Sequence, residues 1–224
     1  MVETNGRAPR DPRRLARALS VTLVAYAATE AGMAVLAAME IGRLMNGAAE
    51  LSIGARLAYF ATTAAWLAAC LLTAALGLLW FYRANQNAAA LASDKSISPA
   101  WSIAWLFVPI ANCVMPFRAM SETWRISLAP ANWKETPLPE RVSFWWGLYL
   151  LSALLGVMEG YPGRTGQDPG PLLLSMELKL ASSCMAIGAA LLLRRIVREI
   201  SDAQAGAVIA PLVSGPTAPA AVSG

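Results

Sequence analysis

Four charged residues that lie in or beside apolar stretches of this 224-residue chain are the first candidates for chemistry. They are Glu30, Glu40, Glu177 and Lys179. An unpaired charge within a membrane costs several kcal/mol, so such residues usually face the interior of a helix bundle. With a rise of about 1.5 Å per helical residue, Lys179 can meet Glu30 or Glu40 at a similar depth. Such a pair could relay protons or substrate, or it could only fix the packing of two helices, and we favour packing.

The second candidate is the turn around Pro109 and Asn112, within the uncharged run 97–116. Non-helical backbone at membrane depth is tolerated only where it is buried in protein or lines a cavity. Asn112 could therefore present its amide to a ligand or an ion path. The alternative, which we favour, is that Asn112 caps the second half of a helical hairpin or satisfies carbonyls freed by Pro109.

Several classes of enzyme and binding protein lack their usual residues here. The chain has no histidine, and its three cysteines (Cys70, Cys113 and Cys184) are far apart. We therefore predict no metal site, no cofactor and no catalytic residue. No dense basic patch with interleaved aromatic residues indicates nucleic acid. A lipid-acting enzyme would have only Glu122, with Arg118 and Arg125 beside it, as its acid.

The elements that must position these residues are membrane helices. Hydrophobic residues make up 57% of the chain and charged residues 14%, whereas about a quarter of a soluble domain is charged. Four apolar runs approach or exceed the roughly 20 residues that a bilayer span needs. They cover residues 18–41, 57–81, 142–158 and 171–193. A signal peptide could explain the basic start, but the first run continues to spanning length.

These runs define the predicted organisation of the chain. We expect a basic cytoplasmic segment at 1–17, a helical membrane domain at 18–200 and a disordered tail at 201–224. The loop at Ser98 and Pro99 has the residues that start a helix. Pro109 interrupts the run that follows, which favours a helix–turn–helix that dips into the membrane and returns.

The distribution of positive charge distinguishes two topologies. If the run 97–116 crosses the membrane, the lysines and arginines outside the last span divide eight against nine between the two sides. If the run returns to the side it came from, they divide fourteen against three. Cytoplasmic loops carry the excess of these residues. The sequence thus predicts an all-α membrane protein of four transmembrane helices plus a re-entrant or interfacial helical hairpin, with five spans as the alternative and both termini cytoplasmic.

A string of aromatic, proline and polar residues between the second and third spans forms a distinctive motif. Its members are Trp80, Arg83, Asn87, Ser98, Pro99, Trp101, Trp105, Pro109, Asn112, Pro116, Arg118 and Trp124. This stretch resembles the domain of unknown function 4328 family of bacterial membrane proteins, and a looser echo runs from Arg195 to Gln204. The family often has Pro-Gly-Trp where this chain has Pro99-Ala100-Trp101. The resemblance implies a multi-span membrane protein and lends no reaction.

Three function classes remain, in descending order of preference. The first is a non-catalytic membrane module for interaction or assembly, whose partners are the lipid bilayer and other membrane proteins or a second copy of the chain. The second is a small-solute or ion pathway lined by the 109–112 turn and the intramembrane Glu and Lys residues. The third is the lipid-acting enzyme. For Arg83 and Asn87, four residues apart on one helical face, lipid headgroup contact is the favoured interpretation.

Overall fold

The computed structural model describes residues 11–47, 51–160 and 170–213, and every element in these ranges is helical. Four long helices carry the fold, and a short helical hairpin lies between the second and the third of them. The elements are α1 (Arg13–Met45), α2 (Ile53–Leu91), α3 (Pro99–Ala104), η1 (Trp105–Phe107), η2 (Ala111–Cys113), α4 (Met115–Leu128), α5 (Glu140–Glu159) and α6 (Gly170–Val213).

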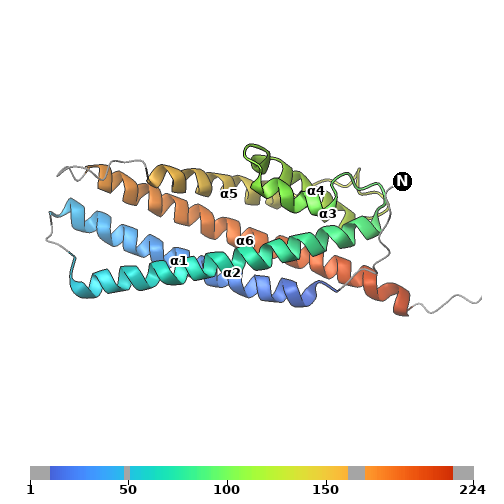
Figure 1. Ribbon diagram of the computed structural model, residues 1–224, viewed down its shortest axis with the longest axis horizontal. Helices are drawn as coiled ribbons and strands as arrows, with labels where there is room; N and C mark the ends of the chain where they lie inside the picture. Colours follow the sequence, from blue (N-terminus) through green and yellow to red (C-terminus); the bar gives the residue numbers. More distant parts are fainter. Residues whose placement is uncertain (1–10, 48–50, 161–169, 214–224) are drawn as a thin grey trace, which may run out of the picture.

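The four long helices run along the long axis of the molecule, with α6 packed between α1 and α5 (Figure 1). Helix α2 packs mainly against α1 and touches α6 only lightly. Each of α1, α2, α5 and α6 is long and apolar enough to cross a membrane. The predicted all-α class, with four such helices, is confirmed.

The segment between α2 and α5 folds back on itself. Its two halves, Pro99–Phe107 and Ala111–Leu128, meet at a bend of 116°. At the bend the Ala111 N–H donates to the Pro109 carbonyl at 2.7 Å, and Ile110 has a φ of 67°. The two ends of the hairpin lie together, because Trp133 Nε1, just after α4, donates to the carboxylate of Asp94, just before α3, at 2.9 Å. The hairpin therefore begins and ends at the same end of the bundle.

Ser98 and Pro99 start α3, as the sequence predicts, and a proline also starts α4. The Ser98 hydroxyl accepts the Trp101 N–H at 3.4 Å, and Pro99 occupies the first turn of α3. Pro116 occupies the first turn of α4. Proline suits these positions because the first N–H groups of a helix have no partner within the helix.

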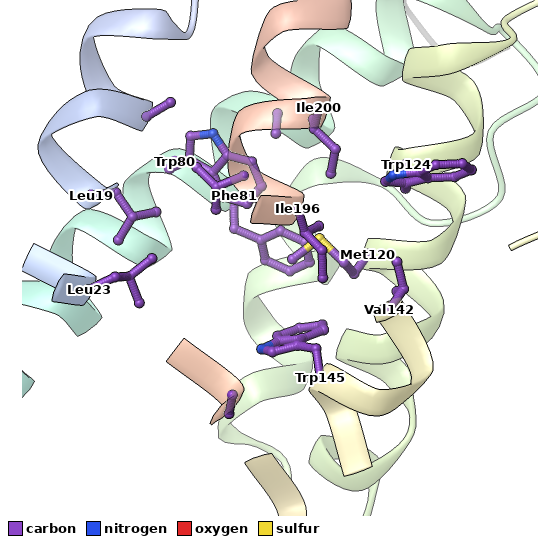
Figure 2. Packing of buried hydrophobic residues seen from close by; sticks show 14 of the residues in the cluster. Leu19, Leu23, Trp80, Phe81, Met120, Trp124, Val142, Trp145, Ile196 and Ile200 are labelled. Carbon is purple, nitrogen blue, oxygen red and sulfur yellow. The ribbon is translucent and has the colours of Figure 1, made fainter. Parts of the chain in front are cut away.

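A cluster of buried apolar residues lies where the hairpin meets the long helices (Figure 2). Side chains from five helices interlock there, and the hairpin contributes to the core directly. The main members are Leu19 and Leu23 from α1, Trp80 and Phe81 from α2, Met120 and Trp124 from α4, Val142 and Trp145 from α5, and Ile196 and Ile200 from α6. Separating the hairpin from the bundle would expose this apolar surface at a large cost in free energy.

The predicted disorder of the C-terminal tail, residues 201–224, is wrong for its first part. Helix α6 continues to Val213, so residues 201–213, expected to be disordered, are helical; residues 214–224 lie outside the described ranges. Ser201 and Gln204 are buried at 1% exposure each. The error arises because this part of α6 packs through polar side chains, which carry no hydrophobic period. At the other end, α1 already begins at Arg13, within the predicted basic segment.

Candidate functional site

Gln204 joins three helices at the end of the bundle that carries the hairpin. Its Oε1 accepts from Asn87 Nδ2 of α2 at 3.0 Å. Its Nε2 donates to the Ala84 carbonyl of α2 and to Ser127 Oγ of α4, both at 2.9 Å. All of these residues are buried. The amide of one α6 residue thus fixes the positions of α2 and α4.

Further hydrogen bonds near the Gln204 amide join α2 to α4 and to α6. The Thr123 hydroxyl of α4 donates to Asn85 Oδ1 of α2 at 3.0 Å, and Asn85 Nδ2 donates to the Phe81 carbonyl. Trp80 Nε1 donates to Ser201 Oγ at 2.9 Å. We call Trp80, Asn85, Asn87, Thr123, Ser127, Ser201 and Gln204 the buried polar network. In the described part of the chain, every buried side-chain N or O atom of this network has a hydrogen-bond partner.

Glu122 anchors the segment that leads into α3. Its carboxylate accepts from the Ser96 N–H at 2.6 Å, from the Ser96 hydroxyl at 2.5 Å and from the Ile97 N–H at 3.1 Å. The Lys95 ammonium lies 3.1 Å from Glu122, and both side chains are at most 6% exposed. Burial lowers the pKa of Lys95, and the negative charge of Glu122 opposes that shift. The sequence prediction missed Lys95 and placed Glu122 only as a conceivable acid.

Glu199 on α6 is a second carboxylate that accepts hydrogen bonds from several elements. It accepts from Arg141 Nε at 3.0 Å and from Trp124 Nε1 at 3.2 Å, and Arg195 Nε lies 3.1 Å from its other oxygen. The Arg141 guanidinium also lies over the Trp124 ring, 5.7 Å from the ring centre. Helices α4, α5 and α6 are therefore held by one carboxylate.

The motif residues of the hairpin divide into packed and outward-facing ones. Trp101 is 53% exposed, and its ring lies 4.8 Å from that of Trp105. Asn112 does not cap α4, because that helix begins without a side-chain cap, so this part of the prediction is wrong. Asn112 Oδ1 is buried and has no partner among the described residues. Beside the turn, the Cys113 carbonyl accepts from Trp146 Nε1 of α5 at 2.9 Å.

The predicted ion pair of Lys179 with Glu30 or Glu40 is wrong. Lys179 lies 3.9 Å from Glu159, and Glu40 pairs with Arg43 one turn along α1. Glu30 is 4% exposed and accepts from Trp66 Nε1 at 2.6 Å.

Trp66 lies between Glu30 and Lys179, the two charges that were expected to pair. Its indole donates to Glu30, and the Lys179 ammonium lies 5.1 Å from the centre of its ring. Ser183 also donates to Glu30, at 2.8 Å. Residue depth along a helix can be read from the sequence, but the rotation that places Trp66 between the two charges cannot. Glu177 is exposed and takes no part in this cluster.

Other predicted residues lie apart from these clusters. Arg83 is exposed although Asn87, one turn further along α2, is buried. Arg118 is also exposed and lines a pocket beside α4. Among the described residues no group of three His, Cys, Asp or Glu side chains is placed to hold a metal ion.

Comparison with known families finds the same family that the motif between α2 and α5 resembles. The family model described as domain of unknown function (DUF4328) matches residues 43–202. No curated protein and no solved structure matches the chain. The matched range includes the hairpin, Glu122 and Glu199, and it ends two residues before Gln204.

Proposed function

The chain belongs to the family of the domain of unknown function (DUF4328), and from this premise we propose that it is a non-catalytic membrane module for interaction or assembly. In this proposal it spans the cell membrane four times, with both termini in the cytoplasm. The charge distribution supports the orientation, because under this topology fourteen of the lysines and arginines, Lys179 excluded, fall on the side of the termini and three on the other.

The observation that carries the proposal is the saturation of the buried polar network. The Gln204 amide nitrogen donates two hydrogen bonds and its oxygen accepts one, all within the chain. Glu122 and Glu199 are likewise surrounded by donors from neighbouring elements. A catalytic acid or nucleophile must instead keep a lone pair or proton for its substrate. The conspicuous polar residues of this chain hold helices together.

The outer face of α2 supports an interaction with lipid and with a partner helix. Large apolar side chains recur there at intervals of about one or two helical turns and are 50–74% exposed. They are Leu57, Phe60, Leu67, Leu71 and Leu79. In the apolar 18-residue stretch of α2 that could cross a membrane, only 11% of the residues are buried within the chain. Lipid tails can cover this face, and a second transmembrane helix can pack on it through van der Waals contact.

A solute or ion pathway is the second candidate, and the unpartnered oxygen of Asn112 favours it. A buried acceptor without a partner costs free energy, and a ligand or ion could satisfy it. Against this, each oxygen of Glu30 already accepts a hydrogen bond, one from Trp66 and one from Ser183, which gives the charged cluster between α1, α2 and α6 a structural role.

Photo-crosslinking in intact membranes tests the proposed module. A photoreactive phenylalanine derivative placed at Leu67 should give a protein adduct of one reproducible mass, because a specific partner occupies a fixed position. The same group at Leu76, which packs against the core, is the control and should react only within the chain. Lipid adducts alone at Leu67, Leu57 and Leu71 would contradict the module. Solute flux in liposomes that disappears in Asn112→Ala would establish the pathway in its place.

A further inference from the structure

A pocket of about 300 Å³ opens beside α4, at the end of the bundle that carries the hairpin. The segment that leads into α3 forms one wall, and the connection from α4 to α5 forms another. Arg118 and Arg125 of α4 line the pocket together with the apolar side chains of Phe117, Trp133 and Leu138. None of the residues that line the pocket belongs to the buried polar network.

The two arginines lie on one face of α4 because they are seven residues, or about two helical turns, apart. Neither forms an ion pair with any residue in the ranges that the structure describes. Arg125 Nε is buried and has no hydrogen-bond partner there. A buried donor of this kind costs free energy until it finds an acceptor.

The carboxylate that lines the pocket does not supply that acceptor. Glu122 is surrounded by the Ser96 and Ile97 N–H groups, the Ser96 hydroxyl and the Lys95 ammonium. The charge of Lys95 offsets that of Glu122, which leaves the positive charges of Arg118 and Arg125 uncompensated. The pocket therefore attracts an anion.

The shape of the donors indicates which anion. Ser121 donates its hydroxyl proton to the Phe117 carbonyl and Ser96 donates its own to Glu122, so the guanidinium groups are the free donors of the pocket. A guanidinium presents a planar fork that matches the oxygen pairs of phosphate. We propose that Arg118 and Arg125 bind a phosphate group, carried by a lipid headgroup or by a soluble phosphate, and that Phe117 and Leu138 contact the apolar part of a lipid ligand.

The test uses the full chain in phosphatidylcholine nanodiscs with two probes, dioctanoyl phosphatidate and inorganic phosphate. Isothermal titration calorimetry measures the affinity of the intact chain and of the variants Arg118→Gln and Arg118→Gln/Arg125→Gln. Arg198→Gln is the matched control, because Arg198 is an exposed arginine of α6 that lies outside the pocket. Arg118 is exposed, so Arg118→Gln removes one donor without a threat to folding.

We expect Arg118→Gln to weaken the binding of phosphatidate about tenfold, the double variant to weaken it further, and Arg198→Gln to change it less than about twofold. Competition by inorganic phosphate would assign the site to a soluble phosphate, and binding of phosphatidate without competition would assign it to a lipid headgroup. The proposal is overturned if Arg118→Gln and the double variant bind phosphatidate as tightly as the intact chain, or if the intact chain binds neither probe.

Discussion

Asn87 and Gln204 are 117 residues apart in the sequence, and their side-chain amides meet at 3.0 Å in the interior of the protein. Asn87 is 5% exposed and Gln204 is 1% exposed. The contact joins the end of α2 to the end of α6, and the further bond of Gln204 to Ser127 brings in the hairpin helix α4. This one side chain therefore couples the motif between α2 and α5 to the C-terminal helix.

The first prediction concerns the stability that Gln204 provides. In Gln204→Ala, Ser127 and the Ala84 carbonyl lose a donor, and a small cavity forms. We expect the free energy of unfolding to fall by about 2–4 kcal/mol. Chemical denaturation in detergent, followed by circular dichroism, measures the change. Gln86→Ala is the control, since Gln86 lies next to Asn87 on α2, is partly exposed and is not part of the buried polar network. Equal losses in the two variants would refute the role of Gln204.

The second prediction concerns the buried pair of Lys95 and Glu122. Either Glu122→Gln or Lys95→Met leaves one buried charge without its partner, so each should cost about 3 kcal/mol of stability. The double variant should cost clearly less than the sum of the two, because it leaves neither charge behind. Lys134→Met, in the exposed pair with Asp94, should change stability little. Additive losses for Lys95 and Glu122 would show that the two residues are not coupled.

The third prediction gives the pH dependence of the same pair. Burial lowers the pKa of Lys95 from its ordinary value of 10.5, and Glu122 opposes the shift. Glu122→Gln removes that opposition, so the pKa of Lys95 falls further. Between that lowered pKa and 10.5 the unfolded chain binds more protons than the folded one, so stability rises with pH. As the pH rises toward 10.5, Glu122→Gln should therefore recover part of its lost stability. Lys95→Met/Glu122→Gln should not, and a parallel profile for both variants would count against the argument.

Much of the fold follows from the physics of the bilayer. The four long helices could be predicted because a span needs a long apolar run, and such runs are visible in the sequence. The hairpin could be predicted because Pro109 interrupts an apolar run and the charges on either side favour a return. The helical end of α6 could not, because Ser201 and Gln204 pack through hydrogen bonds that no hydrophobic period reveals.

The candidate site was only partly predictable, for a related reason. The motif singled out Trp80, Asn87 and Trp124, and all three are buried and bonded to α6. Their partners Ser201, Gln204 and Glu199 lie far away in the sequence. Which polar residues meet depends on the rotation of each helix about its axis, as the misplaced pairing of Lys179 shows. Residue types and depth do not determine that rotation.

The fourth prediction tests the topology. After replacement of the three native cysteines, a single cysteine is placed at Ala131, in the connection between α4 and α5, or at Asn46, at the end of α1; both positions are exposed. An impermeant thiol reagent should label Asn46→Cys in intact cells and should label Ala131→Cys only after the membrane is opened. If Ala131→Cys is also labelled from outside, the hairpin crosses the membrane and the chain has five spans.

The fifth prediction concerns Ile110 at the tip of the hairpin. Its φ of 67° and ψ of −52° form a tight turn closed by the bond from the Ala111 N–H to the Pro109 carbonyl. A β-branched residue is strained in this conformation, and a strained backbone position costs about 1–3 kcal/mol. The Ile110 side chain is 87% exposed, so its removal sacrifices little packing within the chain.

Ile110→Gly should therefore raise the free energy of unfolding in detergent by about 1 kcal/mol, because glycine adopts positive φ without strain and only part of the gain is lost to the freer unfolded chain. Val108→Gly is the control: Val108 has an ordinary extended backbone, with a φ of −97°, so the same change should destabilise the protein. Thermal and chemical denaturation of the two variants provide the comparison. A loss of stability in Ile110→Gly as large as that in Val108→Gly would mean that the turn at Ile110 stores no strain.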